Sequence, residues 1–363
     1  MSPVVIPLLL IIYLPKVAVN FGLFTRFKKV EACAEEELPT VSILVPARNE
    51  AEHIANCLNS LLSIDYPEDK FEVLIGNDQS TDNTAEVVIK MTSEVNQMSL
   101  VHVEAEYEGL VARSNVLAQL ARKAEGEFMV FLDADMQVDR GWLKHMIYPT
   151  LQGYQIVSGY TRVKGSGWLA KMQEWDWYNV LAWLKAASDL GQPGTALGNN
   201  MLVSKAEYYD AGGYEKIGPT FTEDNDLTLA LRKQGARMFQ VASTQHAATV
   251  PVKSFSELVK QRNRWMIGAF RQPLYKLIPV IISRLFVFVA LLVSPWSYKL
   301  AVAIIGHSMF IDLVNAIMMW VKSGIRINIV YALVAPVFNS VLDTFTLLSY
   351  PFNRKVVWKG RKL

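Results

Sequence analysis

The chain has 363 residues, of which 51% are hydrophobic and 19% are charged, and its formal net charge at pH 7 is +2. Soluble domains carry about 25% charged residues, so this composition excludes a disordered chain and argues against a wholly soluble protein. The balance of 36 basic against 34 acidic residues does not fit a nucleic-acid binder, which needs a basic face. Two cysteines, Cys33 and Cys57, are too few for a disulfide framework or a cysteine-based zinc site and favour a reducing compartment.

Three apolar blocks predict membrane-spanning helices. Residues 3–24 contain one charged residue, residues 277–321 contain three, and residues 327–352 contain one. Because a span needs about 20 apolar residues, we expect one N-terminal helix within 1–25 and about three helices within 277–352, with a break at 294–297. Basic residues follow the first block and none precedes it, which indicates an uncleaved anchor rather than a signal peptide.

The basic residues near these blocks predict a topology with one conflict. Arg26, Lys28 and Lys29 favour a cytosolic location for the domain that follows them. Three C-terminal spans would then leave the tail, residues 353–363, outside, although this tail is basic. One C-terminal segment is therefore expected to be re-entrant or interfacial, and the polar residues Arg284 and Asp343 make the first and the last segments the candidates.

Residues 36–250 predict a soluble α/β domain between the apolar blocks. Apolar runs typical of strands and helical periodicities alternate along it, which predicts βαβ units on a mostly parallel sheet. The strand patterns fall at Val41–Val45, Phe71–Ile75 and Phe128–Leu132, and the helical patterns at Ala51–Ser63 and Thr84–Val95. Ligands bind beyond the carboxyl ends of strands in such sheets, and two acidic clusters follow these strand ends.

Asp133 and Asp135 directly follow the third strand pattern. An Asp-x-Asp sequence at this position often only begins a loop. However, two carboxylates that leave a buried strand together can also share a hard divalent cation, which completes its shell with water and substrate phosphates. The spacing therefore predicts a metal site that neutralises a diphosphate leaving group.

Acidic residues also precede two predicted helices. Asp82 is interpreted as a helix cap, whereas Asp78, at the strand end, can accept a hydrogen bond from a nucleobase or a ribose hydroxyl. Glu223 and Asp224 begin a later helix, where acidic residues interact favourably with the helix dipole. If this helix start faces the ligand crevice, one of its carboxylates can serve as the general base on an acceptor hydroxyl.

A basic amphipathic segment, residues 251–275, precedes the C-terminal apolar block. It contains the sequence Gln-x-x-Arg-Trp at Gln261, Arg264 and Trp265. Basic residues around an apolar stripe are typical of a helix on a membrane surface. An adjacent arginine and tryptophan can in addition pair with a diphosphate and stack on a sugar.

In this order, the motifs resemble those of integral-membrane family 2 glycosyltransferases with a GT-A catalytic domain, which has a Rossmann-like α/β fold. The resemblance is carried by Val45–Glu50, Asp65–Pro67, Asn77–Asp82, Arg113–Ala118, Asp133–Asp135, Gly198–Asn200, Glu223–Asp224 and Gln261–Trp265. Two positions depart from the family pattern. Asn77 stands where many members have aspartate, and Gln79 stands where many have glycine.

The resemblance implies an inverting transfer from a nucleotide sugar, a UDP-sugar above all, with a divalent metal such as Mg2+ or Mn2+. It implies that Asp224 is the catalytic base and that Asp135 and Asp133 hold the metal. The donor would be bound by Pro46, Arg48, Glu50, Asp78, Arg113 and Asp133, and the acceptor or the diphosphate by Glu223, Gln261, Arg264 and Trp265. No covalent nucleophile is needed, and the five histidines are scattered.

The acceptor follows less directly from the sequence. The apolar blocks suggest a membrane lipid or a growing polysaccharide, and the tail around Trp358 resembles that of ceramide-glucosyltransferase-like members, which favours glycolipid synthesis. A processive polysaccharide synthase is the alternative within the same chemistry. A catalytically silent nucleotide-sugar-binding membrane subunit is the alternative outside it, and a nucleotidyltransferase would leave Thr-Glu-Asp and Gln-x-x-Arg-Trp unexplained.

Overall fold

The structure is a computed structural model that describes residues 5–30, 38–93, 95–104, 106–107, 109–220, 222–270, 274–352, 357–358 and 361–362. The chain divides into two compact units, and each is described by itself. Unit 1 comprises Met1–Lys28, Val163–Gln192 and Pro251–Val356, and unit 2 comprises Lys29–Arg162, Pro193–Val250 and Val357–Leu363. Unlike the predicted domain, unit 2 excludes residues 163–192, which belong to the unit of the apolar helices, and includes residues 357–363.

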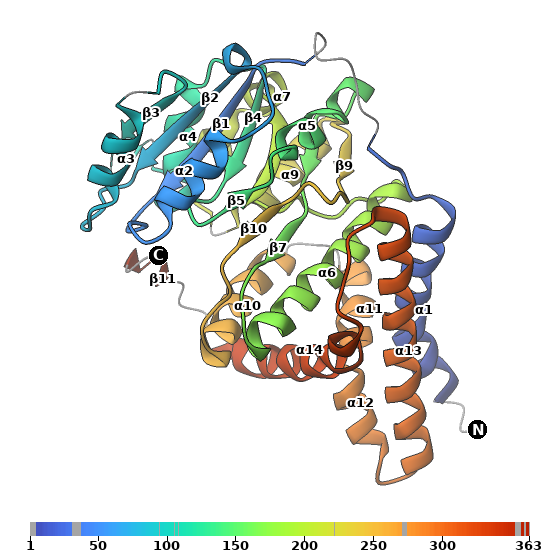
Figure 1. Cartoon of the computed structure of the whole chain (residues 1–363). Helices are drawn as coiled ribbons and strands as arrows, with labels where there is room; N and C mark the ends of the chain where they lie inside the picture. Colours follow the sequence, from blue (N-terminus) through green and yellow to red (C-terminus); the bar gives the residue numbers. More distant parts are fainter. Residues whose placement is uncertain are drawn as a thin grey trace. The chain divides into compact units, whose positions relative to one another are not determined.

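Unit 2 is built on a seven-stranded sheet in the order β3-β2-β1-β4-β8-β6-β9 (Figure 1). Its strands are β1 Val41–Ala47, β2 Phe71–Asn77, β3 Met98–His102, β4 Phe128–Leu132, β6 Ile156–Ser158, β8 Asn200–Ser204 and β9 Met238–Gln240. β1 pairs in parallel with β2 and β4, and β8 is antiparallel to its neighbours β4 and β6. The prediction of an α/β fold with a mostly parallel sheet is confirmed.

Both faces of this sheet are buried, and successive strand residues alternate between two apolar cores. Ile43 and Val45 belong to one core, whereas Leu44 belongs to the other. Burial on both faces explains the nearly continuous apolar runs that identified β1, β2 and β4 in the sequence. The helices of this unit are α2 Ile54–Leu62, α3 Thr84–Thr92, α4 Ala112–Lys123, α5 Trp142–Ile147, α7 Lys205–Asp210, α8 Gly213–Ile217 and α9 Glu223–Lys233.

A second, three-stranded sheet accompanies the main one in the order β5-β10-β7. Its strands are β5 Gln137–Val138, β10 Ala247–Thr249 and β7 Thr161–Val163. β5 begins shortly after the Asp-x-Asp sequence, and it pairs with β10 in antiparallel register. This pairing brings a distant strand beside the predicted metal ligands.

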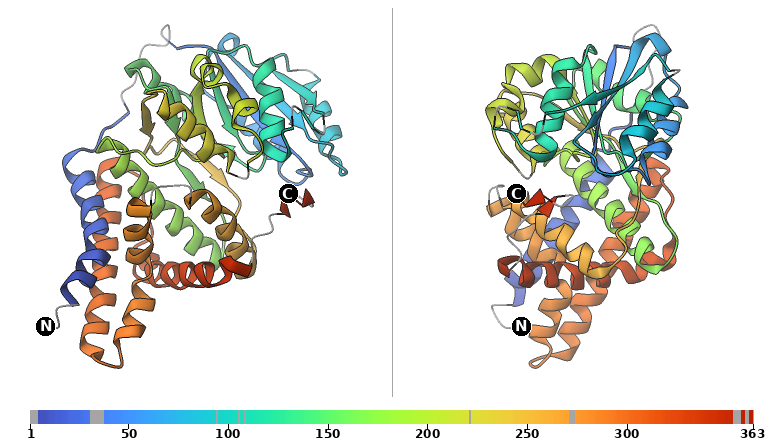
Figure 2. Two further views of the ribbon diagram at one scale, coloured as in Figure 1. Left: turned by 180° about the vertical axis from the view of Figure 1, so that it is seen from behind. Right: turned by 90° about the vertical axis from the view of Figure 1, so that its left-hand side faces the viewer.

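Unit 1 contains the apolar helices and the Gln-x-x-Arg-Trp segment. Its helices are α1 Val5–Thr25, α6 Trp168–Asp189, α10 Phe255–Ala269, α11 Leu274–Arg284, α12 Phe286–Val293, α13 Tyr298–Ser323 and α14 Ile329–Ser349. α1 lies beside α13, and α14 runs across their direction in every view (Figures 1 and 2). The predicted break at 294–297 separates α12 from α13.

Within the described part of the chain, two helices are long and apolar enough to cross a membrane, at Tyr298–Ser323 and Ile329–Phe352. The predicted span at about 277–294 is instead divided into α11 and α12 at Leu285. The residue before this division, Arg284, forms ion pairs with Asp343 at 2.6 Å and with Asp176 at 2.7 Å. Of the predicted basic tail, only β11 Val357–Trp358 and β12 Arg361–Lys362 lie within the described residues.

Lys16 is the one charged residue of the first apolar block, and the fold gives it a partner. Its side chain is 3% exposed, and its Nζ lies 2.7 Å from the Oδ2 of Asp312 on α13. A buried charge without a partner costs several kcal/mol, so the pairing explains how α1 and α13 each accommodate an ionisable residue.

Candidate active site

The carboxyl ends of β1, β2 and β4 carry the loops that contain most of the predicted donor-binding residues. Pro46 is buried within β1, and Arg48 and Glu50 lie in the loop after it. Asp78 directly follows β2, and its N–H donates to the carbonyl of Ala47 at 2.9 Å. The parallel register of β1 and β2 therefore places these two loops side by side.

Arg48 and Asp78 contact one another across these loops. The Arg48 guanidinium donates to the carbonyl oxygen of Asp78 at 2.6 Å and lies 3.7 Å from its Oδ2. The Asp78 side chain is fully buried, and that of Arg48 is 12% exposed. The structure thus brings together two of the residues that the sequence assigned to the donor.

The structure shows what Asn77 and Gln79, the two departures from the family pattern, do at the loop that follows β2. Gln79 has a φ of +50°, in the left-handed region where glycine is least strained. Asn77 is nearly buried, and its Oδ1 accepts a hydrogen bond from the N–H of Ser80 at 3.2 Å, which shapes the same loop. Asp82 accepts from the N–H of Thr84, the first residue of α3, at 3.0 Å, as predicted, although Asn83 occupies the N-cap position.

Arg113, in the first turn of α4, gathers several of the predicted site residues. Its guanidinium lies 2.9 Å from Oδ1 of Asp133 and 2.8 Å from Oε1 of Glu223, and it also donates to the carbonyl of Gly198 at 2.8 Å. The side chains of Arg113 and Glu223 are 11% and 15% exposed, whereas that of Asp133 is 39% exposed and reaches solvent. One cation thereby links the Asp-x-Asp sequence to the start of α9.

Asp224 lies beside Glu223 in the first turn of α9, and no arginine is bonded to it among the described residues. Its Oδ2 accepts from the N–H of Gly198 at 2.9 Å, and its Oδ1 accepts from the N–H of Asn225 at 2.7 Å. Burial, together with the nearby negative charge of Glu223, raises the pKa of Asp224 to about 6. A carboxyl group with a pKa near the working pH has the property that a general base requires.

Gly198 is required for this arrangement. A Cβ at position 198 would lie 2.7 Å from the Cβ of Asp224, which is closer than real carbon atoms approach. The absence of a side chain thus lets the Gly198 N–H reach the carboxylate.

Asp135 lies on the same side of its loop as Asp133, because both are partly exposed while Ala134 and Met136 between and beyond them are buried. Its Oδ2 accepts a hydrogen bond from the hydroxyl of Thr249 on β10 at 3.0 Å. Sequence reasoning missed Thr249, because a lone threonine 114 residues away carries no local signal. The pairing of β5 with β10 is what brings it there.

The Gln-x-x-Arg-Trp residues belong to unit 1, on α10. The Trp265 ring lies between two partners: the Arg262 guanidinium is 4.4 Å from its centroid, and the Trp177 ring meets it edge-on at 5.6 Å. Gln261 and Arg264 lie on the same helix, partly exposed, and Arg264 forms no ion pair with the described residues. That these residues serve the same reaction as Asp224 stays a prediction.

The two arginines of this motif therefore differ in their environment. Arg262 forms an ion pair with Asp176 of α6, which is 1% exposed and also pairs with Arg284. Burial acts to raise the pKa of Asp176, but the two guanidinium groups outweigh this effect and lower it. Arg262 is thus committed to a buried network, whereas Arg264 is the arginine of the motif that a phosphate could engage.

The apolar stripe predicted for α10 is only partly exposed on the surface of unit 1. Phe255 packs edge-on against Phe338 and Phe345 of α14, with ring centroids 6.1 and 5.8 Å apart. Ser254 caps the helix by accepting from the N–H of Glu257 at 3.2 Å. Part of the apolar stripe therefore packs on another helix of unit 1.

The fold and the carboxylate arrangement define a glycosyltransferase of the GT-A type. The chain belongs to glycosyl transferase family 21, whose model matches residues 8–363. The family differs in number from the family 2 that the motifs suggested. A mannosyltransferase from Pyrobaculum calidifontis, solved in complex with GDP-mannose and Mn2+, shares the fold, with a TM-score of 0.63 and 19% identity over 97% of this chain and 99% of that chain.

Curated relatives are similar over the larger part of the chain. A beta-monoglucosyldiacylglycerol synthase of Nostoc sp. is 28% identical over 261 residues, which are 69% of this chain and 53% of that protein. A poly-beta-1,6-N-acetyl-D-glucosamine synthase of Staphylococcus aureus is 30% identical over 276 residues, 71% of this chain and 65% of that protein. The chain thus spans about half the length of the first of these relatives and about two thirds of the second.

Proposed function

We propose that the protein transfers a sugar from a nucleotide sugar to a hydroxyl group of a membrane lipid, with inversion at the anomeric carbon. The observation that carries the proposal is Asp224, a partly buried carboxyl group with a pKa of about 6 beside the carboxylate cluster held by Arg113. The similarity to a glucosyldiacylglycerol synthase supports a lipid acceptor. The sequence motifs lead us to expect a UDP-sugar as the donor.

In the proposed reaction, Asp224 takes the proton of the acceptor hydroxyl as that oxygen attacks the anomeric carbon opposite the diphosphate. A single displacement of this kind needs no enzyme nucleophile. Burial raises the pKa of the Cys57 thiol, which therefore stays protonated and offers no thiolate for a covalent intermediate. Asp78 and Arg48 are proposed to bind the nucleoside, and Arg264 the diphosphate.

The donor set at the Asp-x-Asp sequence fits a divalent cation. Asp133 and Asp135 offer partly exposed carboxylate oxygens. The described residues contain no group of three or more His, Cys, Asp or Glu side chains that could hold a metal ion, so a cation here would need ligands from water or substrate. Two carboxylates suit Mg2+ or Mn2+, which completes its shell with water and phosphate oxygens. Such a cation, when bound, stabilises the negative charge of the leaving diphosphate.

The direction of α14 bears on the membrane topology. We propose an integral membrane protein with a cytosolic catalytic unit, in which α14 lies along the membrane surface instead of crossing it. Its direction across α1 and α13 supports this placement (Figure 1). An interfacial α14 would leave the basic tail in the cytosol and would remove the conflict in the distribution of positive charge.

The test is a transfer assay with purified protein in lipid nanodiscs, with a panel of UDP- and GDP-sugars and with diacylglycerol or ceramide as the acceptor. Mass spectrometry should find a lipid with one added sugar, and both EDTA and Asp135→Asn should abolish its formation. A polymer of sugars as the product would instead favour the polysaccharide synthase. Failure to release nucleotide with any donor, with or without an acceptor, would favour the silent binding subunit.

A further inference from the structure

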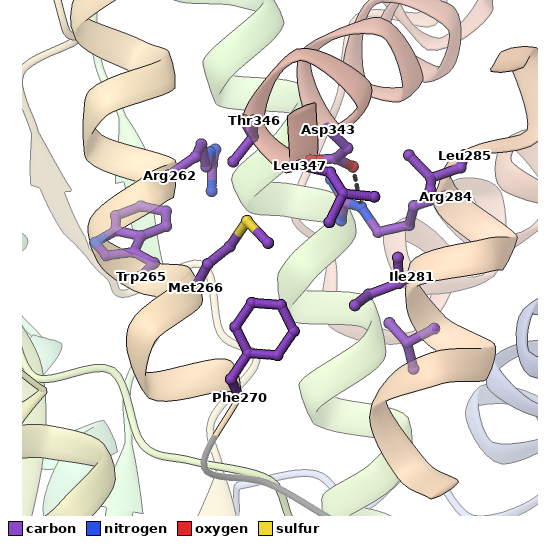
Figure 3. Close-up of a pocket in the computed structure, with 11 residues that line it drawn as sticks. Arg262, Trp265, Met266, Phe270, Ile281, Arg284, Leu285, Asp343, Thr346 and Leu347 are labelled. Carbon is purple, nitrogen blue, oxygen red and sulfur yellow. Dashed lines mark hydrogen bonds and ion pairs between the residues drawn. The ribbon is translucent and has the colours of Figure 1, made fainter. Parts of the chain in front are cut away.

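A pocket of about 180 Å³ lies between α10, α11 and α14 of unit 1 (Figure 3). Apolar side chains make up most of its wall, including Met266 and Phe270 of α10, Ile281 of α11 and Leu347 of α14. Trp265 of the Gln-x-x-Arg-Trp sequence also lines it. A cavity of about 150 Å³ with apolar walls stays dry and binds a hydrocarbon, so this pocket is large enough to hold part of a lipid chain.

The charged residues in the wall of the pocket form ion pairs and do not favour a charged ligand. Arg262 is paired with Asp176, and Arg284 is paired with both Asp176 and Asp343. Two guanidinium groups thus meet two carboxylates, and the hydroxyl of Thr346 donates to the carbonyl of Leu342 within α14. Because these charges are compensated, a phosphate or a carboxylate would gain little here and would lose its hydration.

Two of the helices that line the pocket also carry exposed apolar side chains. Ile278 of α11 is 48% exposed, and Leu348 of α14 is 60% exposed. Ile278 lies two residues before the lining residue Val280, and Leu348 directly follows the lining residue Leu347. Exposed apolar side chains on helices that also line an apolar pocket favour a ligand that comes from the membrane.

We propose that this pocket, with Trp265 in its wall, binds a hydrocarbon chain of the lipid acceptor. The inference rests on the proposed transfer to a lipid. It adds that the protein recognises the acceptor by its chain as well as by its hydroxyl, so that acceptors with long chains are used better than their short-chain analogues.

Chain-length dependence of the transfer tests this inference. Ile281→Trp and Leu347→Trp fill the pocket, whereas Leu291→Trp adds the same bulk on α12 at a position that is 64% exposed and outside the pocket. Loss of contact with about two methylene groups corresponds to a roughly tenfold loss of affinity. We therefore expect the KM for dioleoylglycerol to rise about tenfold in both pocket variants, with the KM for dibutyrylglycerol unchanged and Leu291→Trp like the wild type. An equal rise for both acceptors would overturn the inference.

Photolabelling of the unaltered protein decides the matter independently of activity and of how the variants fold. Diacylglycerol with a diazirine in one acyl chain should label peptides of α10, α11 and α14, and unlabelled dioleoylglycerol should reduce this labelling. Labelling that phosphatidylcholine removes equally well would identify a bystander lipid and overturn the inference. If labelling is as expected but no lipid is glycosylated, the proposed function fails and the pocket remains a diacylglycerol site.

Discussion

Each unit contains an arginine that lies between two carboxylates, and the two arrangements differ in charge balance. In unit 1, Arg262 and Arg284 meet Asp176 and Asp343, so that the charges compensate one another. In unit 2, Arg113 bonds both Asp133 and Glu223, while Asp224 lies close by with no arginine bonded to it among the residues that the structure describes. The first arrangement has as many arginines as carboxylates, and the second carries an excess of negative charge.

This difference separates a structural network from a reactive one. A balanced and buried network fixes the helices that contribute to it, and removal of one partner leaves a charge without compensation. An excess of carboxylates instead favours binding of a cation and raises the pKa of nearby acids. For Asp224, burial raises the pKa most, and the charge of Glu223 raises it further. The following changes test the contrast, from the largest expected effect to the smallest.

Replacement of Asp224 by asparagine should have the largest effect. The amide cannot accept the acceptor's proton, so we expect kcat to fall by about 10²–10⁴-fold, with the affinity for the nucleotide sugar close to that of the wild type. Steady-state kinetics and calorimetric donor titration measure the two quantities. Glu223→Gln is the matched comparison, and a much larger loss of kcat in that variant would mean that Glu223 is the base.

Asp176→Asn should damage unit 1 in stability more than in chemistry. It leaves Arg262 and Arg284 short of a carboxylate in a buried position, which typically costs about 3–5 kcal/mol. The free energy of unfolding in detergent checks this value. Glu174→Gln on the same helix removes the more exposed pair with Lys171 and should cost no more than about 1 kcal/mol. Equal losses in the two variants would show that the buried network is not special.

Arg113→Gln should move the pH dependence of the reaction. Burial and Glu223 raise the pKa of Asp224, and the positive charge of Arg113 opposes them. In the wild type, kcat should therefore rise as the pH increases through about 6, because the ionised carboxylate is the base. Without Arg113 this rise should occur at higher pH. Arg122 lies on the same helix as Arg113, and its half-exposed side chain pairs with Glu215 of α8. Arg122→Gln removes this pair and should leave the pH profile unchanged.

Gln79→Gly should have the smallest effect. The left-handed conformation costs a residue with a side chain about 1–2 kcal/mol, and part of this gain is lost because glycine is more flexible in the unfolded chain. We expect the free energy of unfolding to increase by up to about 1 kcal/mol, which denaturant titration measures. Asn49, with a φ of +53°, provides the control, because asparagine tolerates this region and Asn49→Gly should gain less.

Much of the fold could be predicted because its signals are local. Burial on both faces makes β1, β2 and β4 continuous apolar runs, and the break between α12 and α13 coincides with Pro295 and its neighbours. The division at Leu285 and the direction of α14 could not be predicted in the same way. They coincide with the ion pairs between Arg284, Asp176 and Asp343, which join three helices that are distant in the sequence.

The sequence by itself determined the elements, the order of the motifs and the candidate carboxylates, because periodicity and short motifs are properties of neighbouring residues. Only the tertiary structure decided how these residues are paired. Arg113 meets Glu223 across 110 residues, and Thr249 meets Asp135 across 114. The pKa of Asp224 likewise depends on burial and on Gly198, since a carboxyl group acquires its environment only when distant segments pack around it.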